Sequence, residues 1–136
     1  MRISLVEEGL RVPARDLKIS LGESLSRLEL ISGLQNGWRG EETKTFSREL
    51  ISYLENLIPQ LPLVPLPVPS VKGSIVLEWE DSECGFLTLD ILPNYRIELY
   101  AVSADGFYEI EEVTTTQELF TWVEAFSKNK IFTKQE

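Results

Sequence analysis

The chain has 136 residues, of which 43% are hydrophobic and 26% charged, and its formal net charge is -9. This length and composition are typical of one globular domain and exclude a disordered protein. The chain holds no histidine and a single cysteine, Cys84. Catalysis or metal binding that depends on imidazole is therefore excluded, and so is a disulfide within the chain.

Nucleic acid and membranes are not expected partners. Phosphate contacts need clustered Lys and Arg, and the sequence has no such cluster. No window approaches the roughly 18 apolar residues of a membrane span. Glu7 and Glu8 also interrupt the N-terminal apolar run before it reaches the length of a signal-peptide core. Together with the lone cysteine, these features predict a cytoplasmic protein.

The order of patterns along the chain predicts a single α+β domain with two N-terminal helices, a four-stranded antiparallel meander and a C-terminal helix, the helices packed on one sheet face. Its parts are an N-terminal segment (1–19), a helical pair (20–58), a Pro-rich connector (59–71), an antiparallel sheet (72–113) and the C-terminal helix (115–128).

The helical pair is predicted from capping and periodicity. Ser20 and Glu23 have the spacing of a capping box, in which each side chain satisfies a backbone donor of the first turn. Leucine and isoleucine follow at helical spacing until the Asn36–Gly37 breaker. A second helix starts near Phe46 and must end at Pro59, which cannot continue a helix. We expect the two helices to be antiparallel neighbours.

The connector is rich in proline, with five prolines among residues 59–69. This composition predicts an extended, polyproline-like segment. Pro62 and Pro65 fit the spacing of a ligand for a Pro-recognising domain. The interleaved Leu and Val are too apolar for a free linker, so we favour a strap held against the core.

Four alternating segments follow the connector and predict strands with one buried face. Two turn signals, Pro93–Asn94 and Asp105–Gly106, separate the later ones. Thr115 and Glu118 then have the spacing of a second capping box, and the helix after them should cover the sheet.

Charge is distributed unevenly along the chain. Residues 73–127 hold twelve acidic side chains and one basic side chain, Arg96. If the larger aliphatic residues point inward, acidic and aromatic groups share the other sheet face, together with Val76 and, with less certain parity, Phe107. The candidate partner-binding residues on that face are Glu78, Glu80, Phe86, Asp90, Glu98, Tyr100, Glu109 and Glu111.

Such a face suits a basic protein partner, because carboxylates steer the encounter and aromatics anchor it. The protein would then be a non-enzymatic binding module, such as an antitoxin or immunity protein. One alternative is an acidic face that only keeps the protein soluble. Another is a homodimer or other homo-oligomer, with a structural or regulatory accessory role, that associates through Val76, Phe86 and Tyr100. A carboxylate-dependent enzyme that uses Glu78 with Glu80, or Glu109 with Glu111, is a further alternative. No cofactor and no metal are predicted, although carboxylate sites for Ca²⁺ or Mg²⁺ stay open.

The loop between the predicted helices is a second candidate site. Glycines flank Trp38 and Arg39, so the turn either displays the indole ring or tucks it between the helices and the sheet. We favour tucking, because large aromatic side chains are mostly buried.

The chain also resembles a family of small uncharacterised bacterial proteins. Shared features are an Asn-Trp-Asp-Gly-like turn after a first helix, a Leu-Pro helix end, a Pro-rich strap and a strand similar to Asp-Gly-x-Ile-x-Leu-Glu-Trp. Their counterparts here lie within residues 21–112 and are Asn36 to Gly40, Leu61–Pro62, the strap at 62–69 and Lys72 to Trp79. The chain departs from the pattern through an inserted Gly37, Arg39 in place of Asp and Lys72 in place of Asp. The resemblance implies an order of elements and no particular activity.

Overall fold

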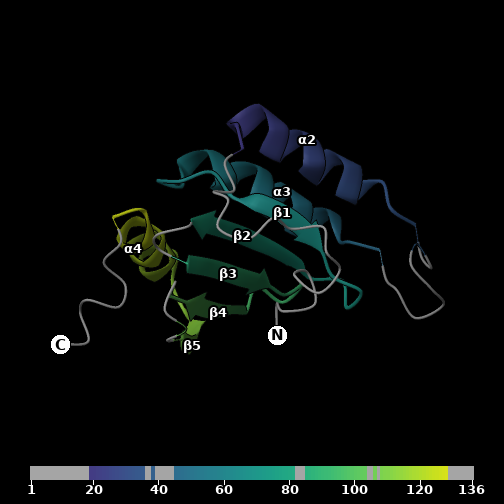
Figure 1. Cartoon of the computed structure of the whole chain (residues 1–136). Coiled ribbons are helices and arrows are strands. Elements are labelled where there is room, and N and C mark those ends of the chain that lie inside the picture. Colours follow the sequence, from purple (N-terminus) through teal and green to yellow (C-terminus); the bar gives the residue numbers. More distant parts are fainter. Residues whose placement is uncertain are drawn as a thin grey trace.

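The structure is a computed structural model that describes residues 19–35, 38, 45–81, 85–103, 106 and 108–128. Its described part is an α+β fold with three α-helices and one five-stranded antiparallel sheet (Figure 1). The elements are α2 (Leu21–Ser32), α3 (Arg48–Leu57), the 3₁₀ turn η1 (Ile58–Gln60), β1 (Leu66–Pro69), β2 (Ile75–Asp81), β3 (Gly85–Ile91), β4 (Ile97–Val102), β5 (Tyr108–Val113) and α4 (Thr116–Ser127).

The two helix starts predicted from capping boxes are confirmed, with one difference in detail at α4, whereas the second helix begins at Arg48, two residues after the predicted Phe46. At α2 the capping box is complete, since Glu23 N donates to Ser20 Oγ at 3.1 Å and Ser20 N donates to Glu23 Oε1 at 2.9 Å. At α4 the Thr115 hydroxyl accepts from Glu118 N at 3.0 Å. The Glu118 carboxylate, however, accepts from Thr114 N at 3.0 Å, one residue earlier than a reciprocal box requires.

The sequence predicts four strands, whereas the described sheet has five. The sheet order is β1-β2-β3-β4-β5, and β1 comes from the Pro-rich connector, with Pro67 opposite Leu77 and Pro69 opposite Ile75. Proline lacks the N–H that a central strand needs for both neighbours. In the described sheet β1 lies at an edge, so its prolines can leave one side of the strand without a ladder.

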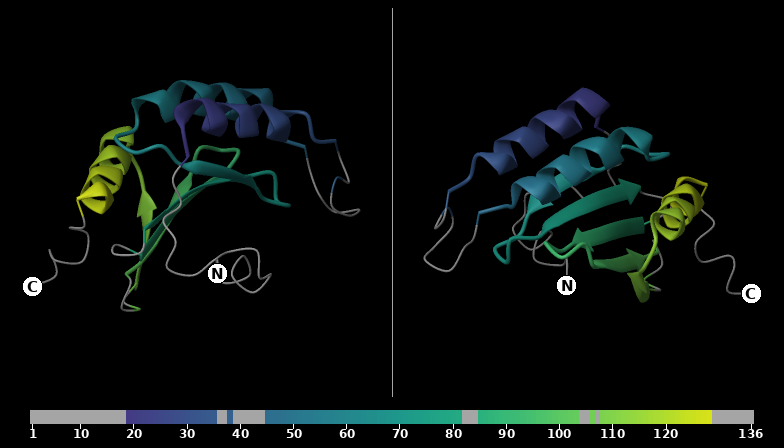
Figure 2. Two further views of the ribbon diagram at one scale, coloured as in Figure 1. Left: turned by 45° about the horizontal axis from the view of Figure 1, so that its top comes forward. Right: turned by 180° about the vertical axis from the view of Figure 1, so that it is seen from behind.

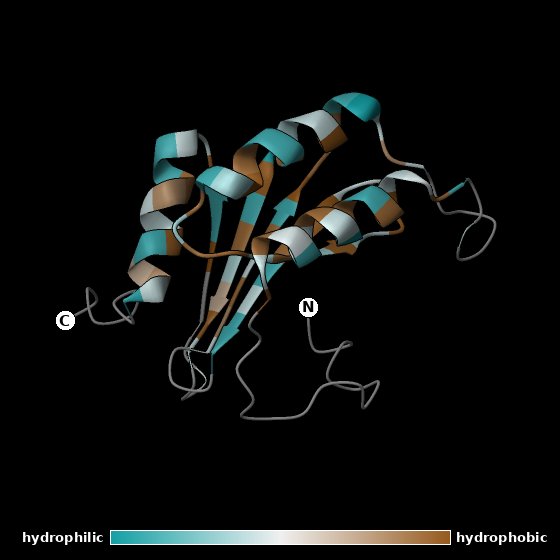
Figure 3. Cartoon of the chain, turned by 90° about the horizontal axis from the view of Figure 1, so that it is seen from above, coloured by the Kyte–Doolittle hydropathy of each residue, from teal (hydrophilic) through white to brown (hydrophobic). Residues whose placement is uncertain are grey.

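The helices pack on one face of the sheet, which we call the inner face (Figure 2). A single core cluster joins Leu28 of α2, Leu54 of α3 and Leu119 of α4 to inward residues of the strands, such as Leu77 and Leu89. Hydrophobic and hydrophilic residues alternate as brown and teal bands along the strands (Figure 3). This two-residue alternation gives the sheet its two different faces.

The connector is held to the rest of the fold by side chains that donate to its backbone. Trp79 Nε1 donates to Leu63 O at 2.9 Å, and Ser24 Oγ of α2 donates to Pro65 O at 2.8 Å. Arg27 Nε reaches Pro67 O at 3.5 Å. These contacts support the interpretation of the connector as a strap.

Replacing Ser24 with Ala should destabilise the fold by about 1–3 kcal/mol, because the buried Pro65 carbonyl would lose its donor. The matched control is Ser26→Ala on the exposed side of α2, which should change stability by less than about 0.5 kcal/mol. Urea unfolding followed by circular dichroism measures both. Equal effects would show that the strap does not depend on Ser24.

Candidate functional site: the outer face of the sheet

The face of the sheet opposite the helices, which we call the outer face, is defined by strand register. Directly opposed residues share a face, so the outward positions form rows across the strands. One row is Val68, Val76, Asp90, Glu98 and Glu112. The next row is Leu66, Glu78, Thr88, Tyr100 and Ile110.

The first row places three carboxylates side by side. Asp90 pairs in register with Glu98, and Glu98 pairs with Glu112. The outer two have cationic neighbours: Lys72 Nζ lies 3.3 Å from Asp90 Oδ2, and Arg96 Nε donates to Glu112 Oε2 at 3.0 Å. Glu98, in the middle of the row, is exposed.

Arg96 forms an exposed ion pair with this acidic surface. Its hydrogen bond to Glu112, followed by the charge of Glu112 and more weakly that of Glu98, raises the pKa of Arg96 above its ordinary value. A raised pKa keeps the guanidinium charged at every pH up to its already high ordinary value. Arg96 therefore offsets part of the negative charge of the row without a dependence on pH in the physiological range.

The two halves of the outer face differ in exposure. Val76, Glu78 and Thr88, which we call the covered half, are each 4% exposed. On β4 and β5, Ile110 is 63% exposed, Glu98 and Glu112 are exposed, and Tyr100 is half-buried. These four residues form the open half. The open half is the part of the face that a partner can reach directly.

Six of the eight predicted partner-binding residues lie on the outer face: Glu78, Glu80, Phe86, Asp90, Glu98 and Tyr100. The other two were assigned to the wrong face. Glu109 pairs in register with Ala101 and Glu111 pairs with Leu99, so both positions belong to the inner face, at the β5 edge. Val113, which is 3% exposed and pairs with Ile97, fixes this parity.

Two residues of the open half were missed by the sequence reasoning. Ile110 and Glu112 point outward because Val113 points inward. The signal that could have found them is a β-branched residue directly before the Thr114–Thr115 cap, where a strand commonly makes its last core contact.

Trp38 is tucked rather than displayed. It is half-buried and packs against the core, with its ring centroid 6.1 Å from that of Phe46. Arg39, predicted with Trp38 as a loop site, lies outside the described residues. Phe107 and Cys84 also lie outside them.

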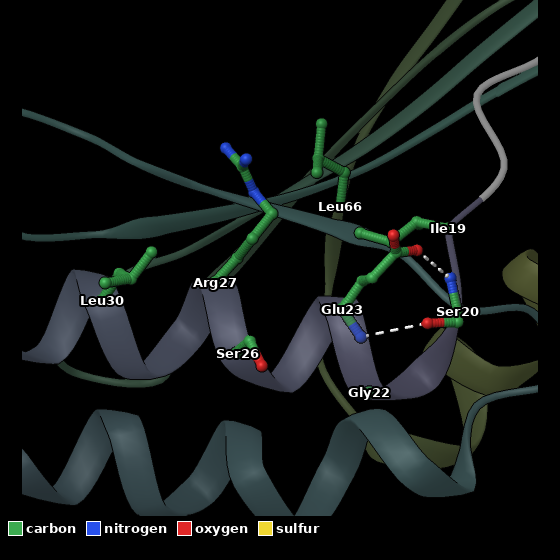
Figure 4. A pocket seen from close by; sticks show the side chains of 8 residues that line it. All are labelled: Ile19, Ser20, Gly22, Glu23, Ser26, Arg27, Leu30 and Leu66. Atoms are coloured by element: carbon green, nitrogen blue, oxygen red, sulfur yellow. Dashed lines mark hydrogen bonds between the residues drawn. The ribbon is translucent and has the colours of Figure 1, made fainter.

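A groove lies at the β1 edge of the described sheet, between α2 and β1 (Figure 4). Arg27 and Leu30 of α2, Leu66 of β1 and Ile19 are among its lining residues. Two of its charged groups already have intramolecular roles, because Glu23 caps α2 and Arg27 contacts the Pro67 carbonyl. The groove is therefore a less convincing ligand site than the open half.

Within the described residues, no group of three or more His, Cys, Asp or Glu is arranged to hold a metal ion. None of the described helices has the length and apolar character to cross a membrane.

Comparisons of the chain with protein-family models, curated proteins and solved structures found no match.

Proposed function

We propose that the protein is a binding module whose open half takes a basic protein partner. The observation that carries this proposal is Ile110, a large apolar side chain that is 63% exposed, opposite Tyr100 and next to a row of carboxylates. An exposed apolar group within a charged rim is typical of a protein-recognition surface.

The row of carboxylates formed by Asp90, Glu98 and Glu112 favours a partner with positive charge. Like charges directly opposite each other on neighbouring strands are destabilising. Lys72 and Arg96 relieve the ends of the row at Asp90 and Glu112, while Glu98 lies between two other carboxylates. A Lys or Arg of a partner placed over Glu98 would reduce this repulsion on binding.

Because β5 lies at an edge of the described sheet, a partner can bind its backbone through main-chain hydrogen bonds. In the described sheet β5 has one strand neighbour, β4. An extended segment can add to such an edge through main-chain hydrogen bonds, with alternate side chains reaching one face. A segment that alternates basic and apolar residues would match Glu98 and Ile110 together. Capture of such a segment could neutralise a toxic basic protein.

Charge reversal of Glu98 tests the proposal. Glu98→Lys should slow association with a partner recovered from the native host several-fold at low salt, and the difference should shrink at high salt, because steering is screened. Ile110→Ser should instead speed dissociation by about tenfold, the equivalent of roughly 1.4 kcal/mol, because it removes the apolar anchor. Surface plasmon resonance measures both rates.

Glu55→Lys is the matched control, since it makes the same charge change at an exposed position of α3. It should leave both rates nearly unchanged. A partner whose binding responds equally to Glu98→Lys and Glu55→Lys would contradict the proposed site. Concentration-dependent sedimentation that Ile110→Ser abolishes would assign the open half to a second copy of the chain instead.

A further inference from the structure

The hydrogen bonds at the turn between β3 and β4 show which backbone groups each strand directs to its neighbour. Leu92 N donates to Arg96 O at 2.9 Å, so these residues form a hydrogen-bonded pair at the end of the ladder. Such pairs alternate along antiparallel strands, and the backbone groups of Tyr100 therefore also point toward β3. The Thr88 hydroxyl of β3 agrees with this direction, since it donates to Tyr100 O at 3.3 Å.

The same alternation sets the direction of the backbone groups on β5. Leu99, the residue before Tyr100, directs its N–H and C=O toward β5, where its register partner is Glu111. Ile110 and Glu112, on either side of Glu111, therefore direct theirs away from β4. No strand of the described sheet pairs with them there. The main chain of Ile110 and Glu112 can thus hydrogen-bond an added strand.

The opposite edge of the described sheet, β1, does not offer such donors. The carbonyl groups of Pro65 and Pro67 accept from Ser24 and Arg27 of α2, so the backbone groups of these prolines face away from β2. A proline has no N–H to offer at such a position. Of the two edges, β5 is therefore the one that presents both donors and acceptors to another strand (Figure 1).

We infer that the basic partner adds an extended segment antiparallel to β5, with two consecutive basic residues and then an apolar residue opposite Glu112, Glu111 and Ile110. This inference rests on the proposed function, because it takes the open half as the binding surface. It adds the direction of the segment and the order of its side chains. Antiparallel pairing gives Ile110 and Glu112 two main-chain hydrogen bonds each, whereas parallel pairing is less stable per residue.

Negative charge on both sides of the β5 edge requires two consecutive basic residues. Glu111 and Glu112 are both exposed, and successive side chains of a strand point to opposite faces. Directly opposed residues share a face, so the first basic residue would lie beside Glu112 on the outer face and the second beside Glu111 on the inner face. Arg96 bonds Oε2 of Glu112, and a carboxylate can accept further hydrogen bonds. The apolar residue would pack on Ile110, which is 63% exposed.

A second copy of β5 fits this edge poorly. Two β5 strands paired antiparallel about Ile110 would place Glu111 of each strand opposite Glu109 of the other. Pairing about Glu111 would place Glu111 opposite its own copy. Like charges directly opposite each other are destabilising, so charge complementarity favours a basic strand over a second copy of the chain.

A probe peptide methylated on its backbone tests the strand addition. The probe is the capped peptide Thr-Thr-Arg-Arg-Val-Thr-Thr, whose valine N–H should donate to Ile110 O, whereas the N–H of the second arginine should point away from β5. N-methylation of the valine should weaken binding at least about tenfold, and N-methylation of the second arginine less than about twofold. Fluorescence anisotropy of labelled peptides at low salt measures the affinities. Equal effects of the two methyl groups, or no binding of the parent peptide at about 1 mM, would overturn the inference.

Hydrogen exchange of the full chain gives a second readout of the same geometry. Binding of the parent peptide should slow exchange of the Ile110 and Glu112 amides, while the Glu111 amide, which faces β4, should keep its rate. Binding without protection of Ile110 and Glu112 would refute strand addition.

Charge exchange at Glu111 tests the order of the side chains. Glu111→Arg should weaken binding of the parent peptide about tenfold, and a peptide with glutamate in place of its second arginine should restore it. Glutamate in place of the first arginine should not restore it. Glu55→Arg on α3 is the control and should leave the affinity nearly unchanged.

The same variants separate this inference from the proposed function. Glu111 lies on the inner face, so a partner that rests only on the outer face would not respond to its replacement. Binding that responds to Glu98→Lys and not to Glu111→Arg would overturn strand addition and leave the proposed function intact. A response to Glu111→Arg without one to Glu98→Lys would support strand addition and contradict the proposed role of the carboxylate row.

Discussion

Replacing Trp79 with Ala should lower the free energy of unfolding by about 3–5 kcal/mol, a large part of the total stability of a small domain. Trp79 is 2% exposed within the core cluster, so its removal leaves a large cavity. The substitution also removes the donor to Leu63 O, which holds the strap. Urea unfolding followed by far-ultraviolet circular dichroism measures the change without depending on indole fluorescence.

Trp79→Phe separates the two contributions. Phenylalanine keeps most of the buried ring volume and loses the hydrogen bond to Leu63, so it should cost clearly less than Trp79→Ala. If Trp79→Ala costs less than about 1 kcal/mol, the inward position of β2 residues is wrong. Equal losses in the two variants would mean that the hydrogen bond, rather than the packing, stabilises this part of the fold.

The sequence correctly predicted those helices and strands whose signal depends on residues close together in the chain. Ser20 and Glu23 form the expected cap because both partners lie within one helical turn. The alternation of Ile75, Leu77 and Trp79 gave the correct inward face, because burial requires a two-residue period. The β1 strand was missed, since proline disfavours strands in general and only an edge position, which depends on tertiary structure, makes it acceptable.

The sequence predicted only part of the candidate site, because the alternation that assigns residues to a face is clear in some strands and weak in β5. Strands β2, β3 and β4 carry strong aliphatic alternation, so the outward positions of Glu78, Asp90 and Glu98 followed from it. In β5 the sequence does not show which residues face the inner side, and the register with β4 is needed to assign them. Residue Glu111 pairs with Leu99 and not with an outward residue. The division into open and covered halves depends on what packs over the sheet, which periodicity does not encode.

Gly85 is expected to be the most sensitive glycine in the described sheet. It begins β3 with φ of 100°, a backbone conformation that other residues adopt only with strain. A Cβ atom at this position would clash with the carbonyl oxygen of Val102 on β4. Gly85→Ala should therefore cost about 3–5 kcal/mol, combining backbone strain with overpacking against rigid backbone. Chemical denaturation of the purified variant measures the loss.

Gly106→Ala is the control that isolates the steric contribution. Gly106 has nearly the same backbone angle, φ of 99°, but a Cβ atom there would meet no heavy atom within 4 Å. Its replacement should cost only the conformational strain, about 1–2 kcal/mol. Because the two glycines share the strain, the difference between the variants reports the close approach of β3 to β4. Equal losses would show that the ends of β3 and β4 separate readily, and that the rows of the outer face are less rigid near Phe86 than their register implies.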